Sequence, residues 1–152
     1  MHQVMAKRMK MNPSVWLVLL ITLLFGCSRD KDHSAAPVLH LSAAIESMSA
    51  AEAITNNARW GKTGKEGPEQ ISTYYKIALD EARLIDFAAL NKDYPALGDH
   101  CQQELLRGLE LIVEGDQKID VKISSSGHDL FDRFLAWYAI HMGEILKATT
   151  RR

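Results

Sequence analysis

Hydrophobic residues recur every three or four positions through most of the chain beyond residue 39, and this period predicts α-helices. We expect four of them, at about residues 40–60, 68–89, 99–114 and 127–147. The last carries the most apolar and aromatic residues. A helix that is apolar along one face must bury that face against another element. The pattern therefore predicts an all-α fold, a small helical bundle of about four helices.

Local signals place the expected helix ends. Asp99 with Gln102, and Ser126 with Asp129, have the spacing of a capping box, which predicts that the third and fourth helices begin there. Gly115 is expected to end the third helix, because glycine readily adopts the conformation that follows a last turn.

Residues 116–124 follow a different pattern. Ile119, Val121 and Ile123 alternate with Asp120 and Lys122, which is the period of a strand. A lone strand has no partner in a helical chain. We expect an extended connector that packs its apolar side chains on the bundle; the alternative is an edge offered to another protein.

The strongest apolar run lies near the start of the chain, from Trp16 to Phe25. The basic residues Lys7, Arg8 and Lys10 precede it, as in the leader of an exported protein. The run is shorter than the roughly 20 residues that a membrane-spanning helix needs. This segment is therefore expected to be a signal peptide.

The end of this run, Leu24-Phe25-Gly26-Cys27, resembles the lipobox of bacterial lipoproteins, although a small residue is more usual at the position of Phe25. The resemblance implies lipidation of Cys27, which becomes the first residue of the mature chain. Ser28 at the next position implies delivery to the outer membrane, facing the periplasm. The alternatives are an ordinary signal peptide and an uncleaved anchor.

These features predict three parts: a signal peptide at 1–26, a lipidated tether at 27–38 and a helical bundle domain at 39–152. The tether is polar and offers little to bury. Without the three basic residues of the leader, 15 basic residues face 19 acidic ones, a net charge of −4. Nucleic-acid binding needs a clustered basic face, so we expect no nucleic-acid partner.

The second cysteine, Cys101, lies on the apolar stripe of the third helix and is expected to be buried as a small apolar residue. The alternatives are an intermolecular disulfide and a reactive thiol. The nearest approach to a metal-ligand pair is His141 with Glu144, and we expect instead a half-buried histidine with a hydrogen-bond partner. Gly61-Lys62-Thr63 looks like the tail of a phosphate-binding loop but lacks its first glycine. No metal, cofactor or enzymatic activity is predicted.

The aromatic residues of the last helix are either core or, where exposed, a face for a partner. They are Phe131, Phe134, Trp137 and Tyr138. The expected function is that of a non-enzymatic lipoprotein that binds or escorts another envelope protein. The architecture looks similar to that of helical pilotin lipoproteins, which escort secretin subunits. The alternatives are an immunity or exclusion lipoprotein and a carrier of a small ligand or metal in the bundle core.

Overall fold

The computed structural model describes residues 36–59 and 67–149. Within these ranges every regular element is helical, and the expected all-α bundle is confirmed. The elements are α2 (Ala36–Arg59), α3 (Gly67–Arg83), α4 (Phe87–Asp93), α5 (Leu97–His100), the π-helical segment η1 (Cys101–Leu106), α6 (Arg107–Lys118) and α7 (Val121–Thr149). The predicted signal peptide, most of the tether and the Gly61-Lys62-Thr63 loop lie outside the described residues.

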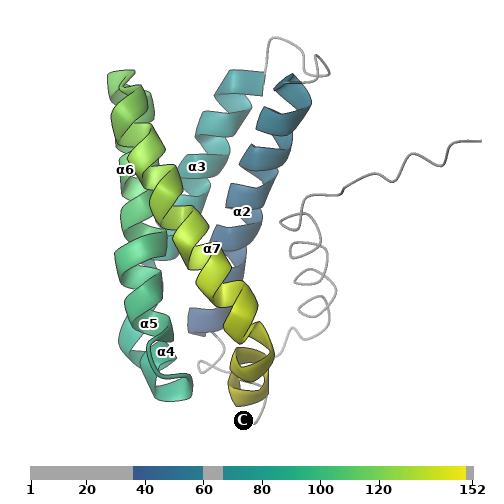
Figure 1. The fold of residues 1–152 in the computed structure, drawn as a ribbon, viewed down its shortest axis with the longest axis vertical. Coiled ribbons are helices and arrows are strands. Elements are labelled where there is room, and N and C mark those ends of the chain that lie inside the picture. The colour runs from purple at the N-terminus through teal and green to yellow at the C-terminus, as the bar shows by residue number, and fades with distance from the viewer. Residues whose placement is uncertain (1–35, 60–66, 150–152) are drawn as a thin grey trace, which may run out of the picture.

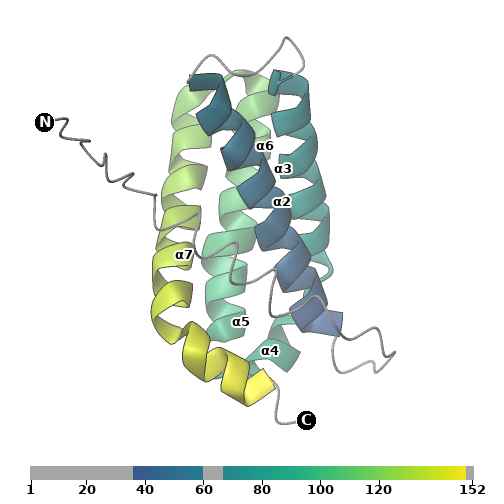
Figure 2. The same cartoon turned by 90° about the vertical axis from the view of Figure 1, so that its right-hand side faces the viewer.

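The bundle consists of two antiparallel helix pairs, α2 with α3 and α6 with α7 (Figure 1). The two pairs join chiefly through α3 and α6. Figure 2 shows α7 at one side of the bundle, α3 at the other and α2 in front. The short helices α4 and α5 close one end. None of the described helices is long and apolar enough to cross a membrane.

The core lies where the stripes predicted from the sequence meet. Its largest fully buried side chains include Ile45 and Met48 of α2, Leu105 of η1, and Leu109 and Ile112 of α6. Full burial of such a side chain contributes roughly 1.5–3 kcal/mol. Cys101 belongs to this core and is a free thiol, which confirms its predicted burial.

The second predicted helix is in fact two helices. The chain leaves helical geometry after Arg83, and Asp86 then caps α4 by accepting a hydrogen bond from the Ala89 backbone N–H at 2.9 Å. The turn keeps Ile85 and Leu90 buried, so the apolar period runs through it unbroken. The apolar side chains Tyr74, Ile77 and Leu84 lie beside this stripe and are exposed to solvent.

The predicted capping box at Asp99 is wrong, because α5 already begins at Leu97. The side chain of Asn91, on α4, forms hydrogen bonds with the first turn of α5. Its Oδ1 accepts from the Gly98 backbone N–H at 2.7 Å, and its Nδ2 donates to the Asp99 carboxylate at 2.9 Å. Ala96 links the two helices with a left-handed backbone, φ 70°.

The expected stop at Gly115 is also wrong. Gly115 is buried inside α6, where it packs against Ser124 of α7, and the helix continues to Lys118. Ile119 then ends it in the left-handed conformation, φ 54°.

Residues 116–124 form no extended connector, because Val121 is already the first residue of α7. The side chain of Asp120 accepts hydrogen bonds from the backbone N–H groups of Lys122 and Ile123, at 2.9 and 3.2 Å. It therefore caps α7 in place of the predicted Ser126, whose hydroxyl donates to the Lys122 carbonyl within the helix.

Candidate functional site

Glycine contacts bring α7 close to α6 along one half of its length. A Cβ atom on Gly127 would lie 2.6 Å from the carbonyl oxygen of Gly108 and 2.7 Å from the backbone nitrogen of Ile112. The two backbones are thus in direct contact here. Figure 1 shows the first half of α7 lying over α6 and the helix crossing toward α2 only at its far end. A hollow lies between the first half of α7 and α2.

This space is a solvent-open groove of about 1060 Å³. We refer to it as the α2–α7 groove. Residues from α2, α3, α6, α7 and the α6–α7 turn line it. They are Glu52, Thr55, Asn56, Tyr75, Gly115, Asp116, Ile119, Asp120, Val121, Ser124, Ser125, His128, Asp132, Leu135, Ala136 and Ala139.

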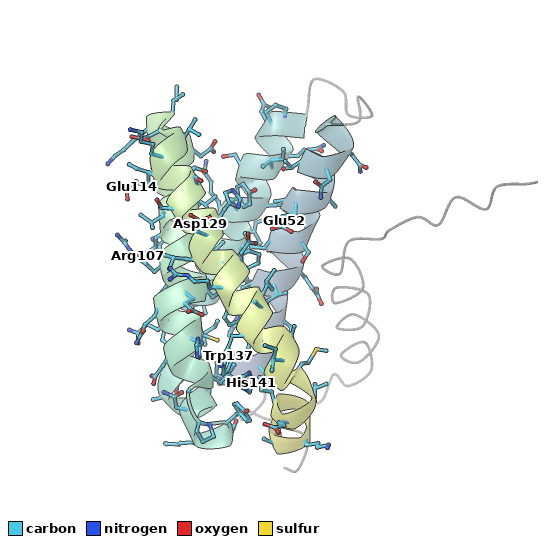
Figure 3. The ribbon with its side chains drawn as sticks, viewed as in Figure 1. Glu52, Arg107, Glu114, Asp129, Trp137 and His141 are labelled. Atoms are coloured by element: carbon cyan, nitrogen blue, oxygen red, sulfur yellow. The ribbon has the colours of Figure 1, made fainter. Side chains whose placement is uncertain are left out.

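The charged side chains of the α2–α7 groove are all acidic, apart from a histidine. Four carboxylates line it, and none of the described lining residues is Lys or Arg. They are Glu52, Asp116, Asp120 and Asp132. Figure 3 shows Glu52 on the side of α2 that faces α7, whereas Arg107 and Glu114 project from the far side of α6. The groove therefore favours positively charged ligands.

A second cleft, between α3 and α6 on the other side of the bundle, has a balanced charge. It encloses about 510 Å³. Its basic side chains are Lys76, Arg83 and Arg107, and its acidic ones are Asp80, Glu110 and Glu114. Arg83 pairs with Asp80 at 3.7 Å and Arg107 with Glu110 at 3.0 Å. The acidic excess is thus a property of the α2–α7 groove and not of every hollow in the surface.

Two of the four groove carboxylates have structural roles. Asp120 caps α7, and Asp116 accepts a hydrogen bond from the Ser72 hydroxyl at 2.6 Å. Glu52 and Asp132 form no ion pair with any Lys or Arg of the described chain. Burial, and secondarily the negative charge of Asp132, raises the pKa of Glu52 above its ordinary value.

His128 does not neutralise this charge. Its ring lies edge-on to Tyr75, with 5.8 Å between centroids. Burial lowers the pKa of His128, although the nearby carboxylates of Asp132 and Asp129 oppose that shift. Burial also raises the pKa of Tyr75. At neutral pH the groove therefore presents a neutral imidazole and a neutral phenol beside its carboxylates.

The groove also presents apolar surface. Leu135 and Ala136 line it on α7, and Ala139 lies one helical turn further along the same helix. At the end formed by the α6–α7 turn, Ile119 and Val121 are 91% and 80% exposed. Exposed aliphatic residues beside a groove are typical of a contact surface.

The predicted partner face on the last helix lies mostly in the core. Phe131, Phe134 and Tyr138 are buried, and Trp137 is half-buried. Their row faces α6 and η1, because the glycine contacts turn that side of α7 inward. A partner face must be exposed, and three of these four residues are buried.

Trp137 stacks against two imidazole rings at the far end of the bundle. His100 lies 3.9 Å from it and His141 4.6 Å, measured between ring centroids (Figure 3 labels Trp137 and His141). The Nδ1–H of His141 donates to the Trp137 carbonyl at 2.8 Å, which confirms the predicted half-buried histidine with a hydrogen-bond partner.

Glu144 does not join His141 as a ligand pair, since it accepts a hydrogen bond from the Tyr94 hydroxyl at 2.9 Å. Within the described ranges, no group of three or more His, Cys, Asp or Glu side chains is arranged to hold a metal ion. Burial raises the pKa of the Cys101 thiol, which keeps it protonated and unreactive.

Sequence reasoning missed the α2–α7 groove. A signal for it exists in α7, where Ser125, His128, Asp132, Ala136 and Ala139 recur every three or four residues beside the apolar row. Such a mixed stripe of small and polar residues resembles an ordinary solvent-exposed face. Only its position opposite Glu52 makes it a wall of a groove.

Comparison of this chain with protein-family models, with curated proteins and with solved structures finds no match.

Proposed function

We propose that this protein is a non-enzymatic lipoprotein, anchored to the outer membrane through Cys27 and facing the periplasm, that binds a segment of another envelope protein in the α2–α7 groove. The observation that carries the proposal is the groove itself, open to solvent between two helices that do not close over it.

The open shape of the groove favours a peptide segment over a small molecule. Small-ligand pockets occupy about 300–1,000 Å³ and enclose most of the ligand. This groove, at about 1060 Å³, has the volume of a large small-molecule pocket, but it is open to solvent and does not enclose a ligand. A helix laid into a groove between helices is a common mode of peptide recognition. The carrier alternative places its ligand in the bundle core, whereas this groove lies between α2 and α7 and is open to solvent.

The predicted anchor gives such a binding domain its physical advantage. Multiple acyl chains on one cysteine hold a protein at a membrane, because each buried methylene contributes roughly 0.8 kcal/mol. Confinement to a membrane surface raises the effective concentration of the domain toward partners on the same surface. A groove of modest affinity is then sufficient to retain or escort a partner.

Site-specific photo-crosslinking in the intact envelope tests this function. A photoreactive amino acid would replace Ala136 or Ala139, both exposed in the groove, in the full-length chain. Gln117, exposed in the α3–α6 cleft, is the matched control position. We expect a discrete protein adduct from the groove positions and not from Gln117. Equal adducts from all three positions, or none from the groove, would contradict the proposal.

A further inference from the structure

We propose that the segment bound in the α2–α7 groove is a cationic amphipathic helix of the partner protein. Its Lys or Arg residues would pair with Glu52 and Asp132, and its apolar face would lie against Leu135 and Ala139. This inference rests on the proposed function and adds the chemistry of the partner to it.

The groove holds two carboxylates that form no ion pair with a Lys or Arg of the described chain. Glu52 on α2 and Asp132 on α7 face the same hollow without a basic side chain from the described chain between them. Burial, and secondarily the negative charge of Asp132, raises the pKa of Glu52, so the free protein disfavours the ionised form of Glu52. A cation placed between them removes that repulsion and gains two attractive contacts.

The apolar surface defines the other face of the ligand. Leu135, Ala136 and Ala139 offer an apolar strip on α7, and Ile119 and Val121 offer a second apolar area at the α6–α7 turn. A ligand that is only charged, such as a polyamine, would leave this strip uncovered. The combination of charge and apolar surface matches a helix that is basic on one side and apolar on the other.

The partner is expected to be helical because the groove is bounded by helices. No strand, and hence no strand edge, occurs in residues 36–59 or 67–149 to pair with an extended peptide. Side chains arranged along α2 and α7 instead offer the ridges into which a third helix packs.

Other occupants fit the charge less well. A second copy would bring another acidic chain to an acidic groove. The chain's own tether alternates Arg29 and Lys31 with Asp30 and Asp32, so its charge is balanced. A metal ion would need a group of ligands that the described residues do not assemble.

The test measures binding of designed peptides to the full-length protein in phosphatidylcholine nanodiscs, with empty nanodiscs subtracted. One fluorescent peptide of about 18 residues, or five helical turns, carries Lys along one face and Leu along the other. A second peptide carries Glu in place of every Lys. We expect the Lys peptide to bind at low salt, at least about tenfold more tightly than the Glu peptide, and to weaken as salt rises.

Two double variants test whether the Lys peptide binds in the α2–α7 groove. Glu52→Gln with Asp132→Asn should weaken the Lys peptide at least about tenfold, because both attractive charges are lost. The matched control, Asp80→Asn with Glu110→Gln, removes the same charge from the α3–α6 cleft and should leave affinity within about twofold. Circular dichroism of both variants verifies that the bundle remains folded.

Three results would overturn the inference: equal binding of the Lys and Glu peptides, equal loss in the two double variants, or a tight complex between two copies that blocks the groove. Failure here is distinguishable from failure of the proposed function. If Ala136 and Ala139 crosslink a partner whose captured segment is not basic, the binding function stands and the cationic helix is refuted.

Discussion

Single side chains set several boundaries of this fold. Asp120 starts α7 and Asp86 starts α4, each by accepting hydrogen bonds from backbone N–H groups of the first turn. Asn91 performs a similar task for α5 from a neighbouring helix. The sequence contains other residues with equally good capping chemistry, such as Ser126 and Asp99. Local spacing therefore identifies candidate caps but does not choose among them.

Substitution at Asp120 distinguishes the observed cap from the predicted one. Asp120→Ala should lower the free energy of unfolding by about 0.5–2 kcal/mol, because two N–H groups of α7 lose their acceptor. Ser126→Ala should change it by less than about 0.5 kcal/mol, because Ser126 lies within the helix. Urea unfolding followed by circular dichroism measures both. A larger loss for Ser126→Ala would contradict the observed start of α7.

Glu52 should lower the free energy of unfolding of the unbound protein near neutral pH. The pKa of Glu52 is raised in the folded state, chiefly by burial, so folding favours its protonated form. Glu52→Gln should therefore stabilise the domain above the folded-state pKa, by up to about 1 kcal/mol for a partly exposed pair. The gain should shrink as the pH falls through that pKa toward the ordinary value.

Thermal unfolding of wild type and Glu52→Gln at several pH values measures this difference. Asp80→Asn, in the charge-balanced cleft, is the control and should show no such gain. A variant less stable than wild type at neutral pH would show that Glu52 supports the fold.

At the scale of elements, helix contacts decide where the groove lies. The apolar stripes of α2, α6 and α7 predict which residues are buried, but not which helix each stripe meets. Gly108 and Gly127 select a close α6–α7 crossing, since any side chain there would meet backbone atoms of the other helix. The same crossing directs the aromatic row of α7 inward and opens the α2–α7 groove.

A pair of glycine substitutions in α7 tests this packing. Gly127→Ala should destabilise the bundle by about 1–3 kcal/mol, because the new Cβ would press on the backbone of α6. Gly143→Ala meets nothing within 4 Å and lies at an exposed helical position. It should instead stabilise by about 0.5–1 kcal/mol, since alanine favours the helix. Denaturant unfolding gives both values, and equal effects would contradict the close crossing.

At the scale of the whole molecule, the anchor and the groove together define the proposed role. The groove lies in the helical domain, whereas the predicted lipid attachment lies at Cys27, outside the described residues. A tether between them would let the groove sample partners near the membrane surface. The two features are separable, so each can be tested without altering the other.

The anchor is tested by Cys27→Ser in the full-length chain. Acyl labelling should be lost, and the protein should remain unprocessed or be released from the outer-membrane fraction, because no thiol is left to carry the lipid. Cys101→Ala is the matched control, since Cys101 is a buried core residue. Labelling, processing and fractionation of that control should match wild type. Unchanged processing and fractionation of Cys27→Ser would refute lipidation.

The sequence by itself determined the all-α class and most of the core. The stripes of Leu41, Ile45 and Met48, and of Cys101, Leu105 and Ile112, are buried as their spacing predicts. This succeeds because helical periodicity is a local property that appears within a few turns of sequence.

Only the tertiary structure decided the break between α3 and α4, the true start of α7 and the acidic groove. The groove depends on residues far apart in the chain, because Glu52 of α2 shares a hollow with Asp132 of α7. The two helix starts depend on local caps, Asp86 and Asp120, which the sequence offers beside other candidates such as Ser126. A carboxylate on a predicted exposed helix face looks like any other solvated charge in the sequence. The binding role proposed for Glu52 depends on packing, which places Asp132 in the same hollow with no Lys or Arg among the described lining residues.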